Sequence, residues 1–186
     1  MGSNGYHFIT HWRVPGTVKE VADVLGDALA LPTWWPAVYL EVTLREPGHP
    51  ETWIGRRIEL FTKGWLPYTL RWDFVVEENR YPYGATIRAE GDFIGRGVWH
   101  FRQDGEMVDV VYDWRIEAQK ELLRRWSFVL KPVFAANHHW AMRQGLASLE
   151  LELARRRART DVERARIPAP PPPTFAWLVT RGRDSR

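Results

Sequence analysis

The chain has 186 residues, of which 45% are hydrophobic and 26% are charged, as is typical of a globular domain large enough to bury a sizeable core. It contains no cysteine, which excludes disulfide scaffolds, cysteine-ligated metal centres and thiol nucleophiles. The sequence shows no secretory signal and no apolar run near the roughly 20 residues that a membrane-spanning helix needs, so we expect a cytoplasmic protein without a membrane span.

The net charge of +3 is unevenly distributed along the chain. Residues 1–154 contain 17 Lys and Arg against 20 Asp and Glu, whereas residues 155–186 contain 9 Arg against 3 acidic residues. The arginine-rich run at 155–159 ends a predicted helix, where cations stabilise the helix dipole without any ligand. A nucleic-acid-binding domain carries its positive charge on a folded face, so we expect no nucleic-acid partner.

The first part of the chain predicts a strand, a helix and an aromatic turn. Residues 6–14 alternate between two faces, as a strand does. Thr17 and Glu20 have the spacing of a capping box, and Gly26 is a suitable end for the helix that they begin. The segment 31–36 holds two tryptophans between two prolines, which limit it to one helical turn or a loop.

Six further segments alternate apolar and polar residues and are joined by short turns. An Asp-Gly pair at 104–105 predicts the last hairpin. Because each segment has one apolar face, we expect an antiparallel sheet with one side solvated and one side covered. The predicted strands are 39–45, 56–63, 69–78, 85–93, 95–102 and 108–116.

The cover for the sheet comes from a helix predicted over residues 122–159, kinked or restarted at Pro132. One stripe of this helix faces the sheet at helical spacing. The stripe consists of Ala135, His138, Met142, Gly145, Leu146, Leu149 and Leu153. A second line on the opposite side, formed by Val133, Trp140, Gln144, Ala147 and Leu151, calls for a partner.

We place a boundary near residue 160, with a folded domain over 1–160 and a Pro-rich C-terminal tail over 161–186. The proline run 168–173 predicts an extended polyproline II segment. It leads to an apolar cluster at 175–179, in which Trp177 is expected to pack on the outer face of the long helix. A homodimer through that outer face is the alternative way to cover it.

Four short motifs support the order of these elements. They are Trp-Arg-Val-Pro at 12–15, Trp-Trp-Pro at 34–36, Tyr-Asp-Trp-Arg-Ile at 112–116 and Asn-His-His-Trp-Ala-Met-Arg-Gln-Gly at 137–145. With them, residues 6–157 resemble the START-like, or SRPBCC, superfamily of polyketide cyclase/dehydrase-like proteins, and the last motif is similar to one uncharacterised bacterial branch. The resemblance implies an α+β helix-grip fold. In that fold a curved antiparallel sheet of about seven strands wraps around a long C-terminal helix, with one or two short helices after the first strand.

The resemblance also implies an apolar cavity between sheet and helix, and the 11 tryptophans, 8 phenylalanines and 6 tyrosines could wall one. The expected ligand-binding residues are Trp12, Leu70, Trp72, Phe74, Trp99, Phe101, Tyr112 and Trp114 from the sheet, with Ala135, His138 and Met142 from the helix. The first hypothesis is binding of an apolar or aromatic, lipid- or polyketide-like small molecule. The alternative is a cyclase/dehydratase-type enzyme, so whether the chain is an enzyme stays open.

His138 and Tyr112 are the candidate catalytic residues of the enzyme hypothesis, because imidazole titrates near neutral pH and can act as acid or base. The alternative is a structural His138 that bonds a backbone carbonyl or Tyr112, with His139 as the spare candidate. The predicted helices carry no His-x-x-x-His spacing, and Gly95-Arg96-Gly97 opens a strand rather than a helix. We therefore expect neither a metal nor a cofactor.

Overall fold

The computed structural model describes residues 5–118 and 121–175, and the side chains of 5–117 and 131–175 within them. Its strands are β1 (Gly5–Pro15), β2 (Tyr39–Glu46), β3 (Arg57–Lys63), β4 (Thr69–Asn79), β5 (Gly84–Gly91), β6 (Phe93–Asp104) and β7 (Met107–Ala118). Its helices are α1 (Val18–Leu25), the 3₁₀-helix η1 (Ala28–Ala30), α2 (Leu31–Trp34), α3 (Glu121–Arg157) and α4 (Asp161–Arg166).

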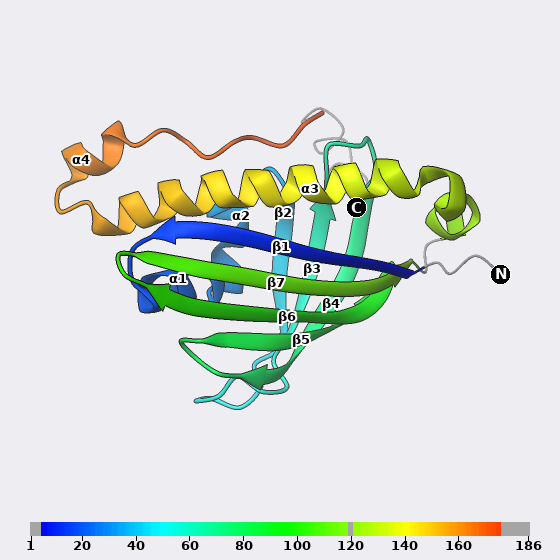
Figure 1. Cartoon of the computed structure of the whole chain (residues 1–186), viewed down its shortest axis with the longest axis horizontal. Coiled ribbons are helices and arrows are strands. Elements are labelled where there is room, and N and C mark those ends of the chain that lie inside the picture. The colour runs from blue at the N-terminus through cyan, green and yellow to red at the C-terminus, as the bar shows by residue number, and fades with distance from the viewer. Residues whose placement is uncertain (1–4, 119–120, 176–186) are drawn as a thin grey trace.

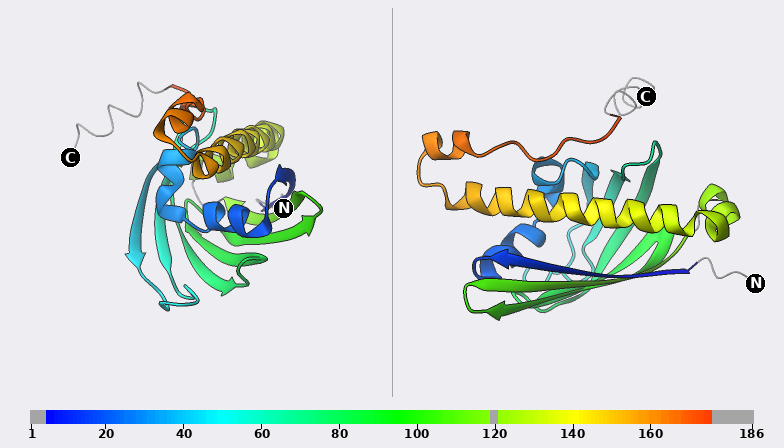
Figure 2. Two further views of the ribbon diagram at one scale, coloured as in Figure 1. Left: turned by 90° about the vertical axis from the view of Figure 1, so that its left-hand side faces the viewer. Right: turned by 45° about the horizontal axis from the view of Figure 1, so that its top comes forward.

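All seven predicted strands form one antiparallel sheet, in the order β1-β7-β6-β5-β4-β3-β2. Consecutive strands from β2 to β7 are neighbours, and β1 completes the sheet beside β7. The sheet curves around α3, while α1 and α2 lie at one end between them (Figures 1 and 2). The α+β helix-grip fold expected from the sequence is therefore confirmed.

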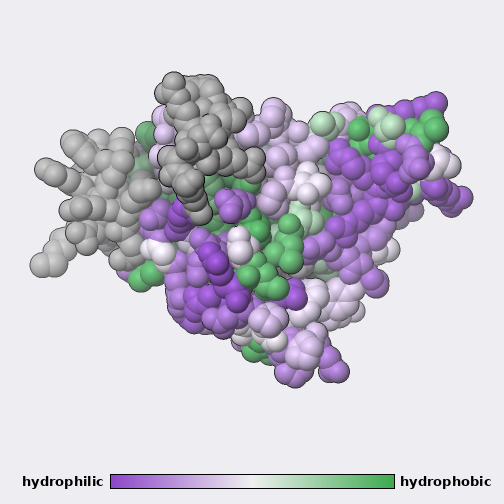
Figure 3. Space-filling view, turned by 180° about the vertical axis from the view of Figure 1, so that it is seen from behind, coloured by the Kyte–Doolittle hydropathy of each residue, from purple (hydrophilic) through white to green (hydrophobic). Residues whose placement is uncertain are grey.

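The alternation of residues 6–14 does not decide which face of β1 points inward, because both faces carry aromatic or histidine residues. In the structure, Trp12 and Val14 are buried on the inner face. The outer face contacts β7 through polar side chains. His7 Nε2 lies at hydrogen-bond distance, 3.0 Å, from Asp113 Oδ1, and Arg13 forms an ion pair with Asp109, with Nη1 3.2 Å from Oδ1. The face of the molecule shown in Figure 3 is mainly hydrophilic, with a small apolar area near its centre.

The predicted capping box begins α1. The Glu20 amide donates to Thr17 Oγ1 at 3.2 Å, and the Thr17 amide donates to Glu20 Oε2 at 2.8 Å. These two bonds satisfy amides that would otherwise lack partners at the helix start. The aromatic turn forms the short helix α2 and buries both Trp34 and Trp35 in the core.

The long helix α3 runs continuously through Pro132, and its first turns leave the axis of the rest (Figure 1). Proline removes a backbone donor and crowds the preceding turn, which accounts for this bend. The helix ends at Arg157, two residues earlier than predicted. A second capping box follows, in which the Glu163 amide donates to Thr160 Oγ1 at 3.2 Å and begins the short helix α4.

Beyond α4 the proline-rich segment runs back along α3 as an extended chain (Figures 1 and 2). The Arg155 guanidinium donates to the carbonyl of Pro168 near its start, and Lys63 Nζ donates to the carbonyl of Thr174 at its end. Trp177 lies outside the described residues, so its packing stays a prediction. Trp140 of the outer helix line is half-buried and packs against the core.

Candidate functional site

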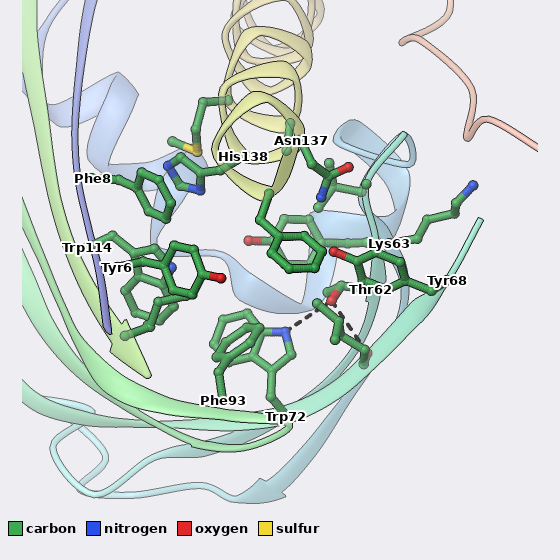
Figure 4. Close-up of a pocket in the computed structure, with 18 of the residues that line it drawn as sticks. Tyr6, Phe8, Thr62, Lys63, Tyr68, Trp72, Phe93, Trp114, Asn137 and His138 are labelled. Atoms are coloured by element: carbon green, nitrogen blue, oxygen red, sulfur yellow. Dashed lines mark hydrogen bonds between the residues drawn. The ribbon is translucent and has the colours of Figure 1, made fainter. Parts of the chain in front are cut away.

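Two adjoining chambers lie between the inner face of the sheet and α3. Chamber 1 has a volume of about 160 Å³ and is walled by the start of β1, the loop after β3 and residues 134–142 of α3 (Figure 4). Chamber 2 has a volume of about 140 Å³ and lies toward α1, η1 and the turn between β4 and β5. Both chambers are lined by Trp35, Tyr39, Trp72, Tyr112 and Met142.

The ligand-binding residues expected from the sequence divide between the chambers. Chamber 1 is lined by Leu70, Trp72, Tyr112, Trp114, His138 and Met142. Chamber 2 is lined by Trp72, Phe74, Trp99, Phe101, Tyr112 and Met142. Trp12 and Ala135 line neither chamber. Trp12 is buried in the core, with its ring 5.9 Å from the rings of Trp35 and Trp99.

Three of these aromatic side chains form a stack on the inner face. The Tyr112 ring lies 3.9 Å from the Trp99 ring and 5.5 Å from the Trp114 ring, nearly parallel to both. A glycine makes this possible, because a Cβ at Gly97 would lie 2.7 Å from the Tyr112 hydroxyl and 2.8 Å from the Trp114 ring. Burial raises the pKa of Tyr112 well above its usual value, so its hydroxyl stays protonated.

The polar group of Trp72 is fully satisfied within the protein. Trp72 Nε1 donates to Thr62 Oγ1 at 3.1 Å, and Thr62 Oγ1 lies 3.5 Å from the carbonyl of Leu70. This bond fixes the indole at the boundary of both chambers. It also leaves the Trp72 side chain to act on a ligand through its apolar ring surface alone.

Other polar atoms on the wall of chamber 1 have no such partner. Tyr6 Oη, Trp35 Nε1 and His138 Nε2 are all buried, and none has a hydrogen-bond partner within the part of the chain that the structure describes. The Tyr6 hydroxyl is directed into the chamber (Figure 4). Because buried polar atoms are normally paired, these unpaired atoms, on three residues that line chamber 1, could bond the polar groups of a guest molecule.

The surroundings of His138 determine the protonation state of its imidazole. Its ring stacks on Phe8 with 4.1 Å between centroids and an interplanar angle of 15°. Burial lowers the pKa of His138 to about 4, and neighbouring His139 contributes to the lowering. The imidazole is therefore neutral near pH 7. Among the described residues, Nε2 bonds neither a backbone carbonyl nor Tyr112.

Several wall residues were missed by sequence reasoning. The alternation of β1 would have found Tyr6 and Phe8 once its inner face was known. Lys63 and Asn137 carried no signal, because a lysine at a strand end and an asparagine beside the helix stripe are ordinary surface residues. Both line chamber 1, and only 3% of Lys63 is exposed.

Metal and membrane features can be judged for the described residues only. Among them, no group of three or more His, Asp or Glu side chains lies close enough to hold a metal ion. None of the helices they form is both long and apolar enough to cross a membrane.

The fold and its cavity place the chain in a known class. Residues 9–154 match the family described as polyketide cyclase / dehydrase and lipid transport, and the chain belongs to this family. No curated protein matches the sequence. Membership supports a role in hydrophobic ligand binding or cyclisation. The matched region ends before Arg155, so α4 and the proline-rich segment lie outside it.

Solved structures with the same fold include three proteins of different origin. TTHA0849 from Thermus thermophilus is 15% identical with a TM-score of 0.65, over 82% of this chain and 100% of its own. The Zhui aromatase/cyclase from Streptomyces sp. R1128 is 15% identical with a TM-score of 0.65, over 83% and 97%. A point mutant of norcoclaurine synthase from Thalictrum flavum, in complex with a transition-state analogue, is 14% identical with a TM-score of 0.54, over 82% and 98%.

Proposed function

We propose that this protein binds an uncharged, apolar or aromatic small molecule, lipid- or polyketide-like, between the sheet and α3. The observation that carries the proposal is the set of orphaned polar atoms on chamber 1, namely Tyr6 Oη, Trp35 Nε1 and His138 Nε2. An apolar guest that carries hydroxyl or carbonyl oxygens would pair these atoms while its rings contact the aromatic wall.

The chamber volumes support a ligand of more than one ring. An apolar cavity of about 150 Å³ holds a single benzene molecule. Chambers of about 160 and 140 Å³ together have room for about two rings, and the five residues that line both would contact a ring in either chamber. The ligand-binding set proposed from the sequence, Trp12 and Ala135 excepted, lies on these walls.

A cyclase/dehydratase-type enzyme is the second candidate, and the neutral His138 favours it. A neutral imidazole with an unpaired Nε2 on the chamber wall could accept a proton from a bound substrate. Tyr112 is the weaker of the two expected catalytic residues, because its hydroxyl lies over the backbone at Gly97. Tyr6, whose hydroxyl is unpaired among the described residues, would be the better partner for His138 in this role.

Filling chamber 1 tests the binding proposal. In the Ala141→Leu variant the larger side chain occupies the chamber, whereas the matched Ala135→Leu change alters a half-buried helix residue that lines neither chamber. We expect the affinity for 2-naphthol, a neutral two-ring phenol, to fall at least about 10-fold in the first variant and to stay near wild type in the second. Binding is measured by tryptophan fluorescence. Equal affinities in the Ala141→Leu and Ala135→Leu variants would contradict the proposal.

A third variant in the same series discriminates binder from enzyme. His138→Phe keeps a ring stacked on Phe8 but removes Nε2. For a binder, 2-naphthol affinity falls only several-fold, as the loss of one hydrogen bond of about 1 kcal/mol implies. For an enzyme, the variant also loses cyclisation of a poly-β-ketone thioester that the wild-type protein converts. If the wild-type protein does not convert the poly-β-ketone thioester, the enzyme hypothesis is rejected for that class of substrate.

A further inference from the structure

The loop of residues 64–68, between β3 and β4, closes one side of chamber 1. Gly64 and Tyr68 of this loop line the chamber. The amide of Leu66 donates to Asn137 Oδ1 of α3 at 3.3 Å. Any Cβ at Gly64 would collide with the Asn137 side chain, so the close approach of loop and helix requires glycine here. The loop thus bridges the gap between the end of β3 and α3.

The C-terminal segment contacts the same loop from the outside. The Thr174 hydroxyl donates a hydrogen bond shared between the carbonyl of Gly64, at 3.2 Å, and the carbonyl of Trp65, at 3.4 Å. Lys63, the residue before the loop, donates from Nζ to Thr174 Oγ1 at 2.9 Å and to the Thr174 carbonyl. The loop is therefore held between Asn137 on one side and Thr174 on the other.

The burial of Lys63 depends on this contact between the loop and the C-terminal segment. Its ammonium group points away from the chamber, toward the C-terminal segment (Figure 4). Only 3% of the residue is exposed, yet Lys63 forms no ion pair with any described carboxylate. Burying an unpaired ammonium group is costly. The segment offsets this cost with the two oxygens of Thr174 and with the ring of Phe175, whose centroid lies 5.3 Å from Nζ.

The segment is also suited to reach the loop in a defined conformation. Its start is fixed by the Arg155 guanidinium, which donates to the carbonyl of Pro168. The proline run after it favours an extended chain of about 3.1 Å per residue, so the six steps from Pro168 to Thr174 span roughly 19 Å. A run of prolines loses little backbone entropy on docking, which favours a single bound path over a loose one.

We propose that residues 167–175 form a strap that holds the loop 64–68 closed against α3, and that release of the strap opens chamber 1 to its ligand. The strap lies outside the part of the chain that matches the family, so it would be an added control on the common fold. The second half of the proposal rests on the proposed ligand-binding function, whereas the first half concerns the protein alone.

Amide hydrogen exchange of the full-length chain tests the first half. Thr174→Val keeps the side-chain shape but removes the hydroxyl that bonds the loop. Lys63→Met independently removes the ammonium group and keeps a buried stem. We expect each variant to speed exchange at Leu66 and Tyr68 about 3- to 10-fold, with no change in β6 or β7. Val162→Ala, at an exposed position of α4 outside the strap, is the control and leaves exchange unchanged. Unchanged exchange in both variants would overturn the strap.

Stopped-flow association of 2-naphthol tests the second half. We expect the association rate constant to rise by a factor similar to the exchange rates in Thr174→Val, because a loop that opens more often admits the probe more often. Faster exchange with an unchanged association rate would overturn the role of the loop in ligand access. If 2-naphthol fails to bind the wild-type protein at all, the proposed function fails for this class of ligand, and hydrogen exchange still decides the strap.

Discussion

The two halves of α3 have the same apolar periodicity but opposite roles. Residues 145–157 are packed solidly, and Leu149 and Leu153 are almost completely buried. Residues 131–142 are mostly half-buried, and several of them border chamber 1. Met142 lies at the junction, where it lines both chambers. One amphipathic stripe therefore serves as core at one end and as cavity wall at the other.

The difference arises from what each half faces. The C-terminal half meets α1 and α2, where a Cβ at Gly145 would collide with the Trp35 ring. The Arg157 guanidinium also bonds Glu20 at 2.8 Å and the carbonyl of Pro15 at 2.9 Å, which fastens this end of the helix. Among the described residues, the N-terminal half meets no covering helix; it borders chamber 1 and contacts the start of β1, where His138 stacks on Phe8. Short helices after the first strand thus decide where the fold is filled and where it is hollow.

The largest expected effect contrasts truncations in the two halves. Leu149→Ala leaves a cavity in a packed region and should lower the free energy of unfolding by about 2–5 kcal/mol. Phe134→Ala removes a larger side chain, but one that borders chamber 1 and is less tightly surrounded by protein, so we expect it to cost less than half as much. Urea denaturation of both variants measures these values. A cost for Phe134→Ala equal to that of Leu149→Ala would contradict the division of the helix.

The sequence predicted the fold well because strand alternation and helical spacing are local properties. The inner faces of β3 and β4 and the stripe from Ala135 to Leu153 follow from period alone. The division into two chambers could not be predicted in this way. Periodicity predicts that Met142 lies on the inward-facing side of α3. It does not predict whether another side chain fills the space between Met142 and the sheet. The burial of Lys63 was equally hidden, since it depends on Thr174, which lies 111 residues away in the chain.

The cavity half should also be the more sensitive to mildly acid pH, through His138. Its pKa of about 4 in the folded protein lies below the usual value of 6.5 expected on unfolding. Between these values the unfolded chain takes up a proton that the folded chain does not, so stability falls as the pH drops from about 6.5 toward 4. His138→Phe should lose this part of the pH dependence in urea denaturation series. The same change at His100, an exposed residue of β6 that lines neither chamber, should keep it. An unchanged slope in His138→Phe would show that the buried imidazole is not responsible.

The smallest effect concerns the packed end of α3, where Glu20 joins α1 to Arg157. The Arg157 hydrogen bonds, followed by those from Thr17, hold the pKa of Glu20 at about 2, below its usual 4.5. As the pH falls from about 4.5 to 2, the unfolded chain is protonated first, so the stabilisation from this carboxylate is lost across that window. The pair is partly exposed, so Glu20→Gln should lower the free energy of unfolding by only about 1 kcal/mol at pH 7 and by nearly nothing at pH 2.

Glu163 is the matched control, because it completes the same kind of capping box in α4, with no arginine of α3 bonded to it among the described contacts. If Glu163→Gln lowered the melting temperature as much as Glu20→Gln, the capping box alone would account for the effect, and the contact with Arg157 would contribute nothing to the packed end.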